Sequence, residues 1–200
     1  VNLIPRFYDA SAGQVCFFGQ NVRKYRRKEL RDQIGIVPQK AVLFAGTVRE
    51  NMQWGKKDAT DEEIWEALKT AQAEEFIRAK EGGLDANIEQ GGRNLSGGQR
   101  QRLTIARALV KKPRVLILDD SASALDYATD AALRKAIRQM EGAPTVFIVS
   151  QRTSSLMSAD RILVLDDGEA TGYGTHEELL KNCQTYREIY NSQYGKKEEA

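Results

Sequence analysis

Short apolar runs alternate along this chain with longer segments whose apolar residues recur at helical spacing. The apolar runs of strand length are Ile34–Val37, Val115–Leu118 and Thr145–Val149. An unbroken apolar run is typical of a strand that is buried on both faces of a parallel sheet. The segment near 60–71 instead places Ile64, Leu68 and Ala71 on one face of a helix. A second helix is expected from Ser96, and it ends at Lys111–Pro113 with cations in its last turn and then a proline. The pattern therefore predicts an α/β fold with a parallel sheet.

The remaining stretches give weaker signals. Val1–Ile4 reads as part of a helix, and residues 14–19 read as a strand. A polar helical stretch is expected over 25–32, and an amphipathic helix over 131–137. Residues 161–169 predict a hairpin, because an Asp-Gly pair between apolar runs is a strong turn signal.

The start of the helix near residue 96 has an unusual composition. Ser96 and Gln99 have the spacing of a capping box, which makes Ser96 the expected N-cap. Gly97 and Gly98 come directly after it, although each glycine in a helix costs about 1 kcal/mol relative to alanine. Glycines here leave backbone N–H groups bare at the positive end of the helix dipole. This start can therefore accept a terminal phosphate, whereas a plain capped surface helix is the alternative.

Two further helix starts are expected from capping chemistry. Thr60 or Asp61 can cap the helix near 60–71. Thr175 and Glu178 form another capping box, which places the chain's only histidine, His176, in the first turn of a surface helix. We expect a structural role for His176 rather than a metal site or a catalytic base.

Two carboxylates end the apolar run Val115–Leu118. Asp119 and Asp120 come directly after it, and open α/β sheets bind ligands at the carboxyl ends of their strands. A carboxylate there can hold hydrated Mg²⁺, and its neighbour can meet an attacking water. The alternative is a core strand that ends in an acidic turn.

Composition excludes several other classes. The 200 residues allow one sizeable core, and a net charge of +2 implies neither nucleic acid nor a membrane surface as partner. The basic run Arg23–Lys28 is best explained as the solvated face of a short helix. Cys16 and Cys183 lack metal-ligand spacing and fit reduced thiols. No apolar run approaches the roughly 20 residues of a membrane helix.

The motifs together resemble the ABC ATPase family in their order and spacing. Leu95–Gln99 (LSGGQ) resembles its signature motif, Leu116–Asp120 its Walker B strand, and Ser123–Asp126 its D-loop. The resemblance implies the cofactors ATP and Mg²⁺, and a P-loop NTPase (RecA-like) sheet with an inserted α-helical signature subdomain. It also implies a head-to-tail dimer in which each ATP lies between the Walker motifs of one domain and the signature of the other. The residues that it assigns to nucleotide binding are Leu95, Ser96, Gly97, Gly98, Gln99 and Asp126.

Further segments carry the resemblance toward exporters. Gln39, after the apolar run Ile34–Val37, matches the family's Q-loop glutamine, which reaches the metal and the attacking water. The resemblance therefore implies Asp119 and Gln39 as the metal ligands. Residues 43–51 resemble the segment after the Q-loop in ABC exporters. Glu89 then occupies the place of the exporter X-loop and would face the coupling helices of a transmembrane domain, although a merely solvated Glu89 explains the sequence nearly as well.

Two positions depart from the family's hydrolytic pattern. Asp120 stands where efficient members carry Glu, and Gln151 stands where they carry the switch histidine. The shorter Asp120 misplaces the attacking water, and about 1 Å of misplacement can cost ~10²-fold in rate. Gln151 cannot take up a proton near neutral pH. With Gln39, these are the candidate catalytic residues, and they resemble the degenerate site of a heterodimeric exporter.

The family's phosphate-binding loop, G-x-x-x-x-G-K-[ST], is absent from the sequence. We therefore expect a domain that lacks its N-terminal part and is inactive alone. The expected division is an α/β core over 1–40 and 111–190, a helical subdomain over 41–110 and a flexible tail over 191–200.

The predicted function is that of the ATP-hydrolysing domain of an ABC exporter, at the cytoplasmic face of the cell membrane through an attached transmembrane domain. A soluble ABC ATPase without a transport role is one alternative, and a non-catalytic regulatory ABC module is the other. The sequence does not specify the transported substrate, because in this family the transmembrane helices select it.

Overall fold

The computed structural model describes residues 1–121 and 124–194, which form two compact units. The first unit is Val1–Val149, and the second begins at Ser150. Residues 41–110 belong to the same unit as the strands on either side of them. The division of this unit into an α/β core and a helical subdomain stays a prediction.

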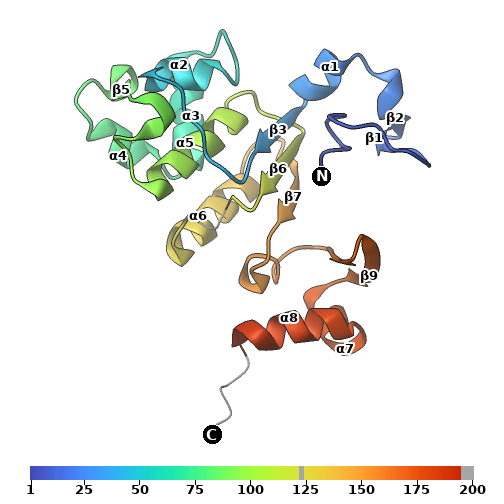
Figure 1. Ribbon diagram of the computed structural model, residues 1–200. Helices are drawn as coiled ribbons and strands as arrows, with labels where there is room; N and C mark the ends of the chain where they lie inside the picture. The colour runs from blue at the N-terminus through green and yellow to red at the C-terminus, as the bar shows by residue number, and fades with distance from the viewer. Residues whose placement is uncertain (122–123, 195–200) are drawn as a thin grey trace, which may run out of the picture. The chain divides into compact units, whose positions relative to one another are not determined.

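The first unit is built on a three-stranded parallel sheet (Figure 1). Its strands are β3 (Ile34–Val37), β6 (Val115–Asp119) and β7 (Thr145–Val149), in the order β3-β6-β7. Both neighbouring pairs are parallel. The three predicted apolar runs thus form one sheet, with the run before Asp119 and Asp120 at its centre.

Burial separates the central strand from the edge strand. Leu116 in β6 is completely buried and Leu118 is 5% exposed, as the unbroken apolar run predicts. The prediction that Thr145–Val149 is buried as well was wrong for one face. Phe147 is 41% and Val149 40% exposed, whereas the alternate residues of β7 pack against the core. β7 pairs only with β6 in this sheet, and its alternating burial is that of a strand covered on one side.

Helices make up most of the rest of the first unit. Thr60 caps α3 and Thr47 caps α2, each in a complete capping box, so the prediction of a cap at Thr60 or Asp61 is confirmed at Thr60. The helices are α1 (Arg27–Asp32), α2 (Val48–Gln53), α3 (Asp61–Thr70), α4 (Glu74–Arg78), α5 (Gly97–Leu109) and α6 (Tyr127–Arg138). The short elements are η1 (Val22–Lys24), η2 (Gly83–Asp85), η3 (Gln90–Gly92), β1 (Cys16–Phe17), β2 (Gln20–Asn21), β4 (Gly46–Thr47) and β5 (Asn87–Ile88).

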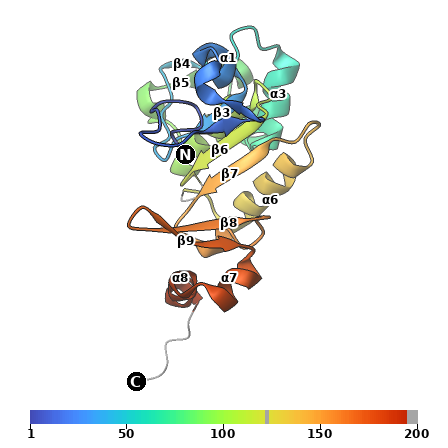
Figure 2. The same cartoon turned by 90° about the vertical axis from the view of Figure 1, so that its right-hand side faces the viewer.

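One hydrophobic core joins these helices to the sheet. It contains residues of β6, of the helices α2, α3 and α5, and of α6, which lies beside β7 in Figure 2. Two glycines allow the closest approaches to α5. A Cβ on Gly55 would lie 2.1 Å from the carbonyl oxygen of Arg107, and one on Gly35 would lie 2.8 Å from that of Ala108. The backbone at Gly35 and at Gly55 therefore packs directly against the C-terminal part of α5, with no side chain between.

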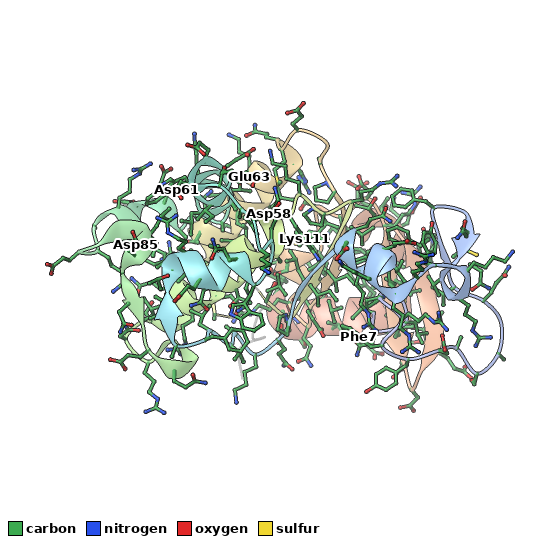
Figure 3. All side chains as sticks on the ribbon, turned by 90° about the horizontal axis from the view of Figure 1, so that it is seen from above. Phe7, Asp58, Asp61, Glu63, Asp85 and Lys111 are labelled. Carbon is green, nitrogen blue, oxygen red and sulfur yellow. The ribbon has the colours of Figure 1, made fainter. Side chains whose placement is uncertain are left out.

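Arg49 ties three helical segments of the first unit together. From α2 it forms ion pairs with Asp61 at the start of α3 and with Asp85 in η2, at 2.9 Å for the second. Figure 3 labels both carboxylates on this helical part of the unit. The hydrogen bonds with Asp85 and Asp61 raise the pKa of Arg49, and the hydrogen bond from Arg49 lowers the pKa of Asp85.

The N-terminal residues do not form the predicted helix. Val1–Ile4 make turns instead, with Ile4 N donating to Val1 O at 3.0 Å. Pro5 comes next in the chain, and the residue before a proline is disfavoured in a helix. Arg31 of α1 holds this segment by donating to the carbonyl oxygens of Pro5 and Arg6, at 3.0 and 2.9 Å.

The same arginine links the N-terminal turns to the end of α5. Its guanidinium lies over the ring of Phe7, with 5.0 Å to the centroid, and its carbonyl oxygen accepts from Lys111 Nζ at 2.9 Å. Phe7 and Lys111 are labelled in Figure 3. Burial lowers the pKa of Lys111. Nearby, the predicted strand over residues 14–19 is confined to Cys16–Phe17, paired with β2.

The second unit packs an antiparallel hairpin against two helices. Its elements are η4 (Thr153–Ser155), β8 (Ile162–Asp166), β9 (Glu169–Gly174), α7 (His176–Asn182) and α8 (Gln184–Tyr194). The predicted Asp-Gly turn is confirmed, since Asp167 and Gly168 both have positive φ, 46° and 83°. The core of this unit is small and consists of Ile162, Val164, Leu179, Cys183 and Tyr186.

The C-terminal helices confirm one prediction and change another. Thr175 caps α7 in a complete capping box, and His176 lies in its first turn with Nδ1 2.8 Å from the Tyr186 hydroxyl. Helix α8 continues through residues 191–194, which were expected to begin a flexible tail, and residues 195–200 lie outside the described residues. Within the described ranges, no helix has both the length and the apolar character to cross a membrane.

Candidate functional site

The carboxyl edge of the sheet brings together two of the predicted catalytic residues. Val37 of β3 is in register with Leu118 of β6. Gln39 and Asp120 each come two residues later, so the parallel pairing carries them to the same edge. Gln39 Nε2 lies 3.3 Å from Asp120 Oδ2, within hydrogen-bonding distance. Gln39 is exposed and Asp120 is half-buried, so both can be reached from solvent.

The backbone at Asp120 turns sharply away from the strand. Asp119 is the last residue of β6 and is in register with Val149, and Asp120 N donates to Val149 O at 2.9 Å. Asp120 has φ of 46°, in the left-handed region, which Asp and Asn enter more readily than most other residues. This turn places successive carboxylates, Asp119 and Asp120, at one strand end.

The oxygen ligands at this edge suit a Mg²⁺ ion that is shared with phosphate and water. They are too few to hold a metal ion by protein ligands alone. Asp119 and Asp120 supply carboxylate oxygens, and Gln39 has an amide oxygen besides the nitrogen that donates to Asp120. Mg²⁺ in nucleotide sites takes one or two protein carboxylates and completes its shell with water and phosphate oxygens. In the described part of the chain no group of three or more His, Cys, Asp or Glu side chains could hold a metal. These residues can therefore hold a metal that a phosphate ligand shares.

The start of α5 has the predicted capping geometry. Ser96 is the N-cap, its hydroxyl accepts from Gln99 N at 3.2 Å, and Gln99 Oε1 accepts from Ser96 N at 3.0 Å. The prediction of a capping box is confirmed. The Gln99 side chain accepts a hydrogen bond within this capping box, so its role in the described residues is to stabilise the start of the helix.

The two glycines of the helix start differ in their surroundings. A Cβ on Gly98 would lie 3.3 Å from the carbonyl oxygen of Ala124, whereas one on Gly97 would meet only Arg100 Nη2, at 3.9 Å. Packing within the described residues therefore explains the glycine at 98 but not the one at 97. Among these same described residues, the N–H groups of Gly97 and Gly98 have no hydrogen-bond acceptor. Gly97 is exposed and can meet an anion directly.

Leu95 and Arg100 hold this helix start against the rest of the first unit, by core packing and by hydrogen bonds. Leu95 is 5% exposed and packs in the main core, so its side chain anchors the motif instead of facing a ligand. Arg100 Nη1 donates to the carbonyl oxygens of Leu95 and Gly92, at 2.7 and 3.3 Å. The sequence analysis did not single out Arg100, which ties residues 88–93 to the helix start.

Asp126 caps the next helix. Its Oδ1 accepts from Thr129 N at 2.9 Å and its Oδ2 from the Thr129 hydroxyl at 2.7 Å. These bonds hold the pKa of Asp126 below its usual value of 3.8. Both carboxylate oxygens, predicted to serve a nucleotide, thus have a structural use at the N-cap of α6. Ser123 of the same predicted motif lies outside the described residues.

Gln151 belongs to the second unit, in the loop that opens it. Its carbonyl oxygen accepts from Gln193 Nε2 at 2.7 Å, and its side chain is part of an exposed residue. Gln193 lies in the segment predicted as a flexible tail, so the sequence analysis missed it. The sequence feature that could have indicated Gln193 is its place in the amphipathic segment Gln184–Tyr194, between Tyr190 and Tyr194.

The structure thus groups the predicted site residues in separate places. Gln39, Asp119 and Asp120 lie at the carboxyl edge of the sheet, where the first two strands end. Ser96 and Gly97 lie at the start of α5, which approaches Ala124 through Gly98. The first group can hold a metal and orient a water, and the second can bind an anion.

Comparisons with known proteins show the family of this chain. A family profile described as "ABC transporter" matches residues 1–123. The chain belongs to this family, and specifically to its ATP-binding domain. The fold is accordingly that of a P-loop NTPase of the ABC type.

Relatives in several bacteria cover nearly all of the chain. It is 45% identical over 196 residues to an uncharacterized ABC transporter ATP-binding protein of Mycobacterium tuberculosis (strain ATCC 25618 / H37Rv), covering 96% of this chain and 33% of that protein. It is 42% identical over 193 residues to a putative multidrug export ATP-binding/permease protein of Staphylococcus aureus (strain NCTC 8325), covering 96% and 33%.

A solved structure agrees with these sequence relatives. A bacterial Atm1-family ABC exporter with ATP bound matches with a TM-score of 0.91 and 36% identity, covering 96% of this chain and 34% of that one. The chain therefore spans about a third of the length of each of these proteins.

Proposed function

We propose that this chain forms part of the ATP-binding domain of an ABC exporter half-transporter, and that it supplies the degenerate site of a heterodimer. The observation that carries the proposal is the contact between Gln39 and Asp120, at 3.3 Å. The intact capping box at the start of the signature helix supports it as a separate observation. The length of the relatives, about three times that of this chain, supports a parent protein with further segments.

In this proposal each group at the sheet edge has one role. ATP and Mg²⁺ supply the reacting phosphate and the charge that offsets the negative charge developing on it. Asp119 contributes a carboxylate ligand to the metal, and Gln39 contributes its amide oxygen. Asp120 accepts a hydrogen bond from the attacking water and, with Gln39, orients it.

The signature residues serve the other nucleotide of the dimer. Ser96 and Gly97 are exposed at the positive end of α5, a helix of 13 residues, and would meet the terminal phosphate held by a second ATP-binding domain. Leu95, Gln99 and Asp126 are engaged in packing or capping, and they would act by holding the shape of this surface.

Two features support a weakened site in this chain. Asp120 is one methylene shorter than the glutamate of efficient family members, and the Gln39 amide lies against its carboxylate. A carboxylate that reaches less far leaves the water poorly aligned. Gln151 can donate or accept a hydrogen bond but cannot carry a proton.

The proposed partners are a second ATP-binding domain and the coupling helices of a transmembrane domain at the cytoplasmic face of the cell membrane. Glu89 is exposed, and its backbone N–H donates to Asn94 Oδ1 at 3.1 Å, which fixes the loop that presents it. We propose this loop as the contact with the coupling helices. The net charge of +2 gives no reason to propose nucleic acid as a partner.

The ATPase rates of the full-length protein alone and with its heterodimer partner test this assignment. We expect the mixed dimer to hydrolyse ATP at least about tenfold faster, as a single misaligned group can cost more than that in rate. Asp120→Glu should raise the rate of this chain's site, whereas Asp120→Asn, the matched control, should not. A homodimer that is as fast as the heterodimer would refute the degenerate-site assignment.

A further inference from the structure

One side chain of the C-terminal helix α8 determines the backbone of the loop that carries Gln151. Gln193 Oε1 accepts from both Thr153 N and the Thr153 hydroxyl, each at 2.9 Å. Gln193 Nε2 donates to Gln151 O at 2.7 Å. A single amide group therefore makes hydrogen bonds to both ends of the segment 151–153, which lies some 40 residues away in sequence.

This segment has little regular structure of its own. Arg152 is extended, with φ of −88° and ψ of 113°, and its N–H donates to the Ser150 hydroxyl at 3.0 Å. Thr153, the first residue of η4, is 2% exposed. Because side chains rather than a strand or helix take up these backbone groups, the conformation of the segment depends on the side chains that bind it.

Helix α8, which carries Gln193, is held in place by contacts with the rest of the second unit. Tyr186, in its first half, is 2% exposed in the core of the second unit, and its hydroxyl lies 2.8 Å from His176 Nδ1. Arg187 Nη1 donates to the carbonyl oxygens of Leu180 and Lys181, at 3.3 and 2.7 Å. These contacts fix α8 against α7 and the hairpin, so Gln193 extends from a rigid element toward a segment that lacks one.

We propose that Gln193 is a positioning residue: it fixes the backbone of Gln151 so that the Gln151 side chain can reach the terminal phosphate of ATP. This inference rests on the proposed function, which counts Gln151 among the residues of this chain's own nucleotide site, and it adds a contact with the terminal phosphate. The amide is matched to the task, because it donates to one backbone group and accepts from another. A carboxylate at this position could accept from Thr153 but would repel the Gln151 carbonyl.

Three variants separate the interactions. Gln193→Ala removes all of them, and Gln193→Glu keeps an acceptor for Thr153 while losing the donor to Gln151. Gln184→Ala is the matched control, because Gln184 lies on the same helix and donates along it, to Glu188 Oε1 at 2.8 Å. Each variant is made in the full-length protein, and its melting temperature is measured alongside.

The decisive measurement is the ratio of ATP to ADP affinity. We expect Gln193→Ala and Gln193→Glu to reduce ATP affinity about tenfold, the size of one hydrogen bond to a charged group, and to leave ADP affinity unchanged. A merely structural role would weaken both nucleotides alike, and a purely Thr153-based role would spare Gln193→Glu. Equal losses for ATP and ADP, or a ratio equal to that of Gln184→Ala, would overturn the proposal.

Amide hydrogen exchange distinguishes a failure of this inference from a failure of the proposed function. In Gln193→Ala the Thr153 amide should exchange faster, while α7 and the hairpin keep their protection. If Gln151→Ala leaves the ATP-to-ADP ratio unchanged, the assignment of Gln151 fails, and the positioning role fails with it even where Thr153 exchange is faster. If Gln151→Ala changes the ratio and Thr153 exchange stays slow in Gln193→Ala, only the positioning role is overturned.

Discussion

Replacing Gly97 with alanine separates what the signature glycine does for the fold from what it does for a ligand. The added Cβ would meet nothing closer than Arg100 Nη2, at 3.9 Å, which is an ordinary contact. Alanine also has less freedom to lose on folding, and in a helix it is favoured over glycine by about 0.5–1 kcal/mol. Gly97 is the first residue of α5, so we expect the lower half of that range.

The expected signs for stability and function are therefore opposite. For a chain of this size, each kcal/mol shifts the melting temperature by about 2–4 °C, so Gly97→Ala should melt about 1–3 °C higher than the parent. In the dimer, the methyl group would keep a phosphate from the Gly97 N–H, and losing a hydrogen bond to a charged group costs about 1.5–3 kcal/mol. ATP affinity at the partner's site should fall by about one to two orders of magnitude.

Thermal unfolding and nucleotide titration of the same preparations test both signs. Gly98→Ala is the comparison variant, because its Cβ would lie 3.3 Å from Ala124 O and forces that neighbour to move. It should lose stability as well as affinity. The reasoning is refuted if Gly97→Ala melts several degrees lower, or if the partner's site binds ATP as tightly as in the parent dimer.

Contacts elsewhere in the chain give three further predictions. Gly55→Ala places a Cβ 2.1 Å from Arg107 O and should lower the free energy of unfolding by about 1–3 kcal/mol, measured by urea denaturation. A Gly55→Ala variant as stable as Gly97→Ala would contradict the packing argument. Arg49→Met removes two ion pairs whose carboxylates are more than half exposed, so it should cost no more than about 1 kcal/mol in the same assay. A much larger loss would contradict the weakness expected of surface ion pairs. The pKa of Asp126 is lowered by its bonds from Thr129, so its contribution to stability is present above 3.8 and is lost as the pH falls through the folded value. Asp126→Asn should flatten this part of the pH profile, and an unchanged slope would refute the linkage.

Features set by neighbouring residues were predictable from the sequence. The capping boxes at Ser96 and Thr175 and the turn at Asp167–Gly168 all formed as expected. Each depends on side chains or φ angles within a few residues, so the local sequence contains the whole interaction. The same holds for β6, whose unbroken apolar run is buried at the centre of the sheet.

Features set by distant contacts were not predictable in this way. The apolar run of β7 gave no sign that one of its faces would be exposed, because exposure depends on which elements pack against the strand. Val1–Ile4 had helical composition, but Pro5 and the bonds from Arg31 hold turns there. Gln193 looked like part of a polar tail, and its role depends on a loop some 40 residues earlier. Leu95 and Gln99 carried motif positions whose burial and capping appear only in three dimensions.

The hydrogen bonds from Arg100 couple the start of the signature helix to the segment before it. One guanidinium closes a ring through the carbonyl oxygens of Gly92 and Leu95, and a Cβ on Gly92 would lie 2.8 Å from the Arg100 side chain, so the ring has no slack. We therefore expect a displacement of the segment over residues 88–93 to reach the first turn of α5 directly, through the two hydrogen bonds of this one side chain.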